Sequence, residues 1–217
     1  MSELTNTFLL VYAGLFPIVN PIGGAPLFLG LTSLRTPAER HLLARRVAIN
    51  SALLLIGSMF VGSHLLVFFG ITLPVVRIAG GLVLVAFGWK LLHSGLDIDG
   101  GEAASRSRGP AESESFYPLT LPLTVGPGSI SVAIALGSQR PSEHAPAEVA
   151  LLAAAALAGI LAISLTVYVC YRFAETLIAR LGDSGINIVV RLSAFILLCI
   201  GIQILWTGYS TLPPVPR

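Results

Sequence analysis

The chain alternates long apolar runs with short polar segments. Six runs are rich enough in apolar residues to be read as single units, and they cover approximately residues 7–34, 41–69, 74–92, 116–138, 147–173 and 188–209. A helix needs roughly 20 consecutive apolar residues to cross the hydrocarbon core of a bilayer. The pattern therefore predicts an all-α integral membrane protein with six transmembrane segments.

Two of these runs are interrupted near their middle by residues that disfavour a helix. The first contains Asn20-Pro21-Ile22-Gly23-Gly24-Ala25-Pro26, and the fourth contains Gly126-Pro127-Gly128. Proline lacks the backbone N–H and clashes with the preceding turn, while glycine adds backbone freedom. We expect spans one and four to be broken, either discontinuous or re-entrant, with new helices beginning after Pro26 and at Ser129.

The polar segments carry the signals for where other helices start. Thr36-Pro37-Ala38-Glu39 has the pattern of a capping box, with Thr36 as N-cap and proline at the first helical position. A Gly182-Asp183-Ser184-Gly185 turn precedes the sixth run. These signals predict a helix start shortly after Thr36 and a turn before span six.

The two halves of the chain repeat the same order of features. In each half a broken span comes first, and a short glycine-containing turn precedes an arginine near the start of the third span, Arg77 or Arg191. Because three is an odd number of spans, the two copies must face opposite ways across the membrane, as in many secondary transporters. The sequence predicts two inverted three-span repeats, residues 1–93 and 116–217, joined by a hydrophilic cytoplasmic linker at 94–115 whose composition cannot bury a core.

Composition agrees with a membrane environment. Of the 217 residues, 54% are hydrophobic and 11% are charged, and the mean hydropathy is +0.84. Soluble domains carry roughly 25% charged residues. The net charge of +2 is too small to indicate nucleic-acid binding. The expected partner is the lipid bilayer, and the sequence does not set the oligomeric state.

The basic residues predict the orientation. With the N-terminus outside, the cytoplasmic side receives Arg35, Arg40, Arg45, Arg46, Lys90, Arg106, Arg108, Arg172 and Arg180, and the outer side receives Arg140 and Arg217. Cytoplasmic loops carry an excess of Lys and Arg. We therefore expect a multi-pass membrane protein with both termini outside.

The breaks are the candidate binding site. Unwound backbone is tolerated at membrane depth only where protein buries it or it lines a wet cavity, so both breaks should face each other near the midplane. Helix N-termini favour an anionic group. The expected substrate-binding residues are Asn20, Pro21, Gly23, Gly24, Thr120, Thr124, Gly126, Pro127, Gly128, Ser129, Arg77 and Arg191. An alternative is that the prolines and glycines only kink helices for close packing.

Other chemistry is less well supported. Carbonyl groups freed before Pro21 and Pro127 would suit Na⁺, so sodium coupling is an open expectation, and no other cofactor is indicated. Arg77 and Arg191 are expected to be mirror-placed, and each is read either as a headgroup anchor or as a ligand for an anionic group. No catalytic triad, zinc motif or carboxylate pair is recognisable, so we expect no enzymatic activity.

Several of these motifs together resemble one family. Asn20-Pro21-Ile22-Gly23-Gly24-Ala25-Pro26, Arg77-Ile78-Ala79-Gly80-Gly81, Pro118-Leu119-Thr120-Leu121-Pro122, Gly126-Pro127-Gly128-Ser129-Ile130 and Gly185-Ile186-Asn187-Ile188 with Arg191 are similar to the MarC family of six-span bacterial inner-membrane proteins. The family name refers to multiple antibiotic resistance, and the resemblance implies transport of small neutral amino acids such as glycine and alanine, as described for some relatives. The chain departs from the family pattern at Ser193-Ala194 and at Thr207, so a substrate preference is not carried over.

Three functions follow as hypotheses. The first is a secondary transporter or exporter of a small amphiphilic solute with an anionic group, most simply a small neutral amino acid, bound at the paired breaks. The second is a polyprenyl-phosphate or lipid-phosphate translocase that uses Arg77 and Arg191. The third is a structural or regulatory membrane protein with no transported ligand.

Overall fold

A computed structural model describes residues 3–94, 114–138 and 145–212, and all regular structure within these ranges is helical. The first half contains α1 (Glu3–Val19), α2 (Pro21–Leu31), α3 (Pro37–Phe68) and α4 (Leu73–Ser94). The second half contains the π-helical segment η1 (Ser115–Thr124), α7 (Pro127–Ser138), α8 (Pro146–Arg172) and α9 (Ala174–Ser210). The predicted all-α fold is confirmed.

Four helical stretches are long and apolar enough to cross a membrane: α3, the Leu73–His93 part of α4, α8, and the Ser184–Ser210 part of α9. Two further candidates are bent pairs: α1 with α2, bent by 40°, and η1 with α7, bent by 70°. The count rises to six if each bent pair is one span. The breaks predicted for spans one and four are thus confirmed.

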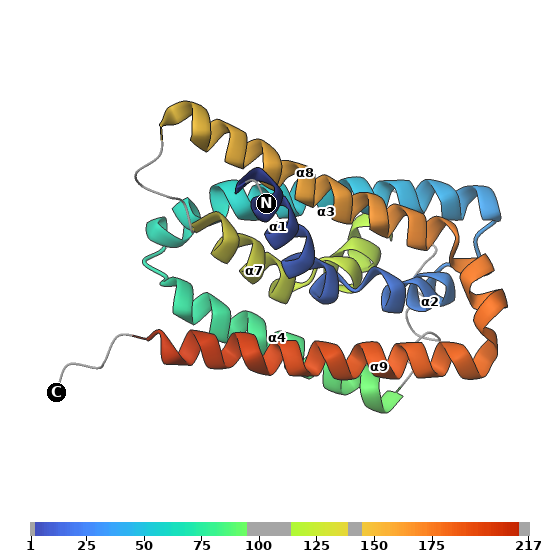
Figure 1. The fold of residues 1–217 in the computed structure, drawn as a ribbon. Coiled ribbons are helices and arrows are strands. Elements are labelled where there is room, and N and C mark those ends of the chain that lie inside the picture. Colours follow the sequence, from blue (N-terminus) through green and yellow to red (C-terminus); the bar gives the residue numbers. More distant parts are fainter. Residues whose placement is uncertain (1–2, 95–113, 139–144, 213–217) are drawn as a thin grey trace.

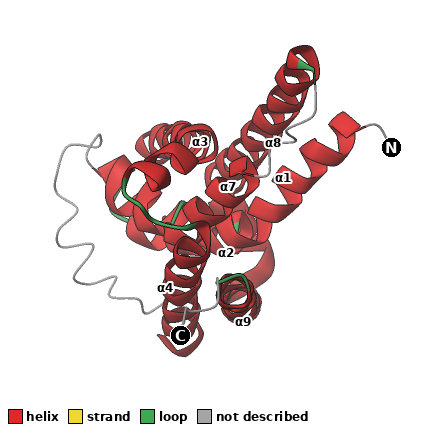
Figure 2. Cartoon of the chain, turned by 90° about the vertical axis from the view of Figure 1, so that its left-hand side faces the viewer, coloured by secondary structure: helices red, strands yellow, loops and turns green. Residues whose placement is uncertain are grey.

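The helices form two groups that pack against each other. One hydrophobic cluster joins α1, α2, α3, η1, α7 and α8 around Leu15, Phe28 and Ile160. A second cluster joins α4 to α9 around Leu84, Val190 and Leu197 and includes Ile18 of α1 and Leu27 of α2. Figures 1 and 2 show the α4–α9 pair running along one side of the other helices. We call the first group the six-element body and the second the α4–α9 pair.

Glycines allow α4 and α9 to approach each other closely. A Cβ on Gly81 would lie 2.7 Å from the backbone N of Leu205, and one on Gly201 would lie 2.8 Å from the backbone N of Val85. A Cβ on Gly88 would lie 2.9 Å from the backbone N of Leu198. Small residues at helix crossings are how membrane helices gain packing contacts without a hydrophobic driving force. The glycines of α4 and α9 therefore define this interface.

The helices of the two halves make corresponding contacts. In this comparison α1 corresponds to η1, α2 to α7, α3 to α8 and α4 to α9. Helix α1 packs on α8 as η1 packs on α3, and α2 packs on α9 as α7 packs on α4. The α3–α8 and α4–α9 contacts map onto themselves under the same exchange. This is the pattern expected of a two-fold repeat, while the inverted orientation of the copies in a bilayer stays a prediction.

Several local expectations are confirmed or corrected. The capping box is present, since Glu39 N–H donates to Thr36 Oγ1 (3.3 Å) and Thr36 N–H donates to Glu39 Oε2 (2.8 Å). The helix expected after Pro26 begins earlier, at Pro21. A proline at the first helical position loses nothing, because that N–H has no intrahelical acceptor. For the same reason, the helix expected at Ser129 begins at Pro127.

The segment before span six also differs from the prediction. Residues 174–181 are helical and belong to the start of α9, which changes direction at Gly182, where φ is 64°. The predicted turn is therefore a sharp kink within a longer helical element (Figure 1). The expected linker at 94–115 lies outside the described residues except at its two ends.

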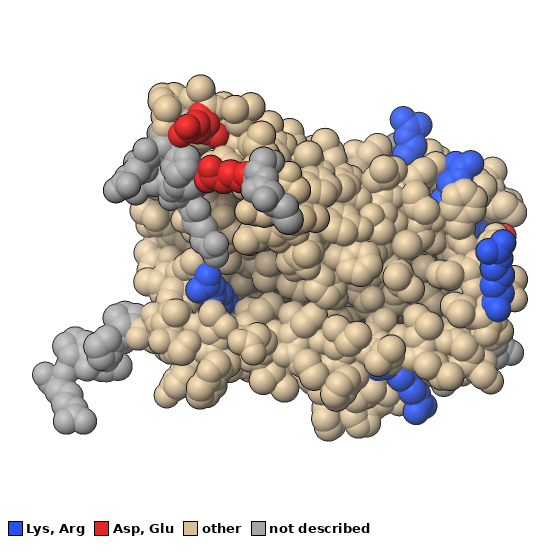
Figure 3. Space-filling model, in the orientation of Figure 1, with Lys and Arg blue, Asp and Glu red and all other residues tan. Residues whose placement is uncertain are grey.

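Basic side chains gather at one end of the molecule. On the face shown in Figure 3, most basic side chains gather at the right-hand end, and acidic side chains are visible at the opposite end. At the basic end Arg35 forms an ion pair with Glu114 (2.6 Å), and Arg40 pairs with Glu175. We call this the basic end of the molecule.

We predict that Gly81→Ala lowers the stability of the fold. The added methyl group meets backbone atoms of α9 rather than a flexible side chain, so the helices must separate at a cost of about 1–3 kcal/mol. The measurement is the midpoint of thermal unfolding in detergent. Gly57→Ala is the matched control, because a Cβ there meets no atom within 4 Å. An equal melting temperature for Gly81→Ala and wild type would contradict the close packing.

Candidate functional site

The first break is a single residue. Asn20 adopts the left-handed conformation (φ 49°, ψ 57°), which among non-glycine residues asparagine tolerates best. Its side-chain Oδ1 accepts a hydrogen bond from Gly23 N–H (3.2 Å), so it caps the start of α2. Asn20 therefore both redirects the chain and satisfies a backbone donor that the break exposes.

The second break is longer and is built by prolines. Tyr117 and Leu121, which precede Pro118 and Pro122, have extended rather than helical backbone angles. Proline disfavours the helical region for the residue before it. These two residues unwind η1, and the chain then turns at residues 125–126 into α7.

Two threonines satisfy the unwound backbone of η1. Thr120 Oγ1 donates to Ser115 O (2.7 Å), and Thr124 Oγ1 donates to Leu119 O (2.7 Å). Both hydroxyls are buried. The sequence suggested that these threonines bind a ligand, but the hydroxyl of Thr120 is used inside the segment and Thr120 lines neither pocket described below.

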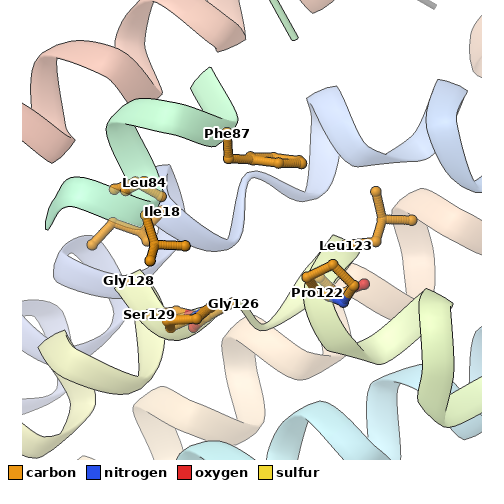
Figure 4. Close-up of a pocket in the computed structure, with 11 residues that line it drawn as sticks. Ile18, Leu84, Phe87, Pro122, Leu123, Gly126, Gly128 and Ser129 are labelled. Carbon is orange, nitrogen blue, oxygen red and sulfur yellow. The ribbon is translucent and has the colours of Figure 1, made fainter. Parts of the chain in front are cut away.

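A small cavity lies at the second break. Its walls include Gly126, Pro127, Gly128 and Ser129 from the break, Pro122, Leu123 and Thr124 from η1, Val83, Leu84 and Phe87 from α4, and Ile18 from α1. Figure 4 shows Ile18, Leu84 and Phe87 across the cavity from Gly126 and Ser129. Its volume is about 50 Å³, more than the roughly 10–15 Å³ that a cavity needs to hold a water molecule.

A narrower pocket adjoins the first break. It is lined by residues that include Asn20 and Gly24 of the break and Leu91 and Leu197 of the α4–α9 pair. It shares three walls with the cavity at the second break: Ile18, Phe87 and Leu123. The fold therefore brings both breaks to one region, between the six-element body and the α4–α9 pair.

The two helix N-termini at this region differ in their free donors. In α2, Gly23 N–H is capped by the Asn20 side chain, and Gly24 N–H donates to Asn20 O (2.8 Å). In α7, Gly128 and Ser129 occupy the first turn, where helical geometry supplies no acceptor for the backbone N–H groups, and both residues line the cavity. The start of α7 is therefore the better place for a carboxylate.

The carbonyl oxygens before the two prolines are already used. Asn20 O accepts from Gly24 N–H, and Gly126 O accepts from Ile130 N–H (3.1 Å) and from the Ser129 hydroxyl (2.9 Å). Each of these carbonyls closes the first turn of the helix that follows, so neither is left without a donor as the sequence suggested, and sodium coupling stays a prediction. Within the described residues no group of three or more His, Cys, Asp or Glu side chains could hold a metal ion.

Tyr171 connects the two breaks, although no motif in the sequence singles it out. Its side chain is buried, its hydroxyl is 2.9 Å from Thr124 Oγ1, and its ring stacks on Phe28 of α2 with centroids 4.6 Å apart. A Cβ on Gly24 would lie 2.7 Å from this hydroxyl. Tyr171 of α8 thus touches the second break through Thr124 and the first through Gly24.

Ser193 is a second residue beside the first break. A Cβ added to Gly23 would lie 2.7 Å from both Cβ and Oγ of Ser193 on α9. Gly23 is therefore needed for close contact between α2 and α9. In the sequence, Ser193 stands out only as a departure from the family pattern.

The two arginines are not brought to the cavity. Arg77 is half-buried near the start of α4. A Cβ added to Gly208 of α9 would lie 2.9 Å from the Cβ of Arg77. Arg191 is exposed on α9, one turn before Ala194, which packs against Gly88 of α4. Since Gly208 packs near Arg77 and Ala194 near Gly88, α4 and α9 are antiparallel, and the arginines lie toward opposite ends of the pair.

The comparison with known proteins decides the family. A family model described as MarC family integral membrane protein matches residues 5–212. This chain belongs to the MarC family. The resemblance inferred from the sequence motifs is thereby confirmed.

Relatives within the MarC family align along almost their whole length. A membrane protein of Pyrococcus abyssi is 31% identical over 211 residues, covering 96% of each chain. The membrane protein YhcE of Escherichia coli K12 is 32% identical over 207 residues, covering 94% of this chain and 92% of YhcE. The inner membrane protein MarC of Escherichia coli strain SMS-3-5 is 30% identical over 213 residues, covering 96% of each chain. No solved structure matches this MarC-family chain.

We predict that Tyr171 and Thr124 are energetically coupled. Tyr171→Phe removes one buried hydrogen bond and should cost about 1 kcal/mol. Thr124→Val should cost more, because it also leaves Leu119 O without its partner. In a double-mutant cycle of thermal unfolding, the double variant should be less destabilised than the sum of the single variants. Simple additivity would show that the hydroxyl contact contributes nothing.

Proposed function

We propose that this MarC-family protein is a secondary transporter or exporter of a small solute with an anionic group, with a small neutral amino acid as the substrate class. The observation that carries the proposal is the meeting of two helix breaks at one cavity. Close packing alone would explain kinked helices, but it gives no reason for the cavity between them. Broken helices at a central site are a recurring feature of secondary transporters.

The chemistry of the cavity favours a carboxylate attached to a small apolar group. The N–H groups of Gly128 and Ser129 and the positive end of the α7 dipole would hold the carboxylate. The opposite wall of Ile18, Leu84 and Phe87 is apolar and suits a short side chain. The cavity is small, which favours a small solute in this conformation.

The division of the fold suggests how access could alternate. The cavity lies at the boundary between the six-element body and the α4–α9 pair, where Leu123 and Val132 pack against both hydrophobic clusters. Many secondary transporters move one bundle against the other around a fixed site. We infer that the α4–α9 pair moves against the body during transport, and the exchange pattern of helix contacts supports the predicted inverted repeats.

The arginines belong to a separate hypothesis. A lipid-phosphate translocase that used Arg77 and Arg191 would have to carry its headgroup along the length of the α4–α9 pair, since neither arginine lines the cavity. No contact of either side chain in the described structure favours this route over an anchor at the membrane interface. The solute proposal therefore uses the breaks without the two arginines.

Filling the cavity should stop transport. In proteoliposomes, Gly128→Val should lower the rate of radiolabelled alanine or glycine exchange about tenfold or more, because its side chain projects toward Leu84 in a space of only 50 Å³. Gly30→Val is the matched control on α2, since a Cβ at Gly30 meets no atom within 4 Å. If wild-type protein exchanges neither amino acid, or if Gly128→Val exchanges them normally, the proposal fails.

We also propose that both termini lie outside a cytoplasmic membrane, with the basic end facing the cytoplasm. In a cysteine-free background, cysteines introduced at Thr5 and Thr211 should react with a membrane-impermeant maleimide added to intact cells. A cysteine at Thr36, at the basic end, should react only after the membrane is permeabilised. The reverse pattern would contradict this orientation.

A further inference from the structure

We propose that the outer face between α3 and α8 holds one anionic phospholipid, with its phosphate group at the basic end of the molecule. This site lies away from the cavity at the breaks and does not depend on transport. It is a groove of about 520 Å³ between the two helices, lined on α3 by Arg45, Ala48, Ile49 and Ala52. On α8 the lining residues are Leu161, Ser164, Leu165 and Tyr168.

The groove begins at the depth of lipid headgroups. Helix α3 has 32 residues and a length of about 48 Å, longer than the hydrocarbon core of about 30 Å. Counting back about 20 apolar residues from Phe68 reaches Ile49. Arg45 lies one turn further toward the basic end, so its guanidinium group is at the level where lipid phosphates are found.

Helix α8 places complementary groups at the same level. It runs antiparallel to α3, and its last turn is at the basic end (Figure 1). There the Arg172 guanidinium donates to the Tyr168 hydroxyl (2.6 Å) and lies 5.7 Å from the centre of the Tyr168 ring. Neither Arg45 nor Arg172 forms an ion pair with a carboxylate in the described part of the chain. Their charges are therefore available to a phosphate.

An unpartnered hydroxyl marks the next level of the groove. Ser164 lies one turn below Tyr168, its side chain is 5% exposed, and its Oγ has no hydrogen-bond partner in the described structure. A buried hydroxyl without a partner costs free energy. One helical turn is about 5.4 Å, which matches the spacing between the phosphate and the ester carbonyls of a phospholipid. Because Ser164 lines the groove, a change of its rotamer toward the groove would let the buried hydroxyl donate to an ester carbonyl.

The remaining walls suit an acyl chain. Ala48 and Ala52 are small and leave the groove open, while Ile49, Leu161 and Leu165 are apolar and exposed at its sides. From the basic end, the groove presents a cation, then a hydroxyl, then apolar side chains. These match the phosphate, the ester groups and the acyl chain of a phospholipid, in that order. Basic pockets between membrane helices on the cytoplasmic side are known to select anionic lipids.

The test measures lipid binding by thermal stabilisation of the delipidated protein in detergent. Phosphatidylglycerol added in mixed micelles should raise the melting temperature in a saturable way. Phosphatidylcholine with the same acyl chains should raise it less at every concentration, and inorganic phosphate should have no effect. Equal effects of the two lipids would overturn the proposal, and an equal effect of inorganic phosphate would show a simple anion site instead.

Variants then locate the site. Arg45→Gln should shift the phosphatidylglycerol titration about tenfold to higher concentration, because a charge-assisted hydrogen bond is lost. Arg180→Gln is the matched control, since it removes one exposed charge from the same end without lining the groove. Identical titrations for Arg45→Gln and Arg180→Gln would overturn the proposal.

The acyl part of the site needs its own variant. Ala52→Phe fills the groove and should weaken binding of phosphatidylglycerol while leaving the melting temperature of the lipid-free protein within a few degrees of wild type. If this variant instead changes the ratio of dimer to monomer in light scattering, with no change in the lipid titration, the groove is an interface between two copies of the chain and the proposal is wrong.

Discussion

A backbone in hydrocarbon must satisfy its own hydrogen bonds, and the structure of this protein depends on how it meets that requirement at two breaks. Lipid offers no donors or acceptors, so every exposed N–H or C=O group costs several kcal/mol. The first break meets the requirement with one residue, since Asn20 caps the helix that it starts. The second break uses the hydroxyls of Thr120 and Thr124, which reach back to carbonyl groups inside η1. The backbone N–H groups that still lack an acceptor are those at the start of α7, and the cavity lies beside them.

The same requirement explains why the breaks lie where they do in the bundle. Each is enclosed by protein, with the six-element body on one side and the α4–α9 pair on the other. Tyr171 contributes to both, because its hydroxyl meets Thr124 and its ring stacks on Phe28. Both breaks are therefore kept away from lipid, while the outer faces carry exposed apolar side chains such as Leu165, Ile188 and Phe195.

The sequence predicted much of this fold because membrane helices give strong local signals. Six apolar runs, the capping box at Thr36 and the proline and glycine clusters placed the spans and the two breaks. The exact start of α2 was missed, since Pro21 reads as a breaker although it is harmless at a first helical position. Residues 174–181 were missed because eight residues of mixed polarity give no clear period.

The site was harder to predict than the fold. Sequence order showed that two breaks exist, but only the packing of α1, α4 and η1 shows that they share Ile18, Phe87 and Leu123. Tyr171 could not have been singled out, because one tyrosine in an apolar run carries no periodic or motif signal. Arg77 and Arg191 attracted attention through their matched positions, yet distance along α4 and α9 separates them from the cavity.

The two glycines with positive φ have a mechanical consequence. Gly70 (φ 65°) lies in the short connection from α3 to α4, and Gly182 (φ 64°) forms the kink within α9, after its first eight residues. Because α4 and α9 are antiparallel, these two joints fasten the α4–α9 pair to the body at opposite ends. Connections at opposite ends limit how far the pair can slide along its own axis against the body.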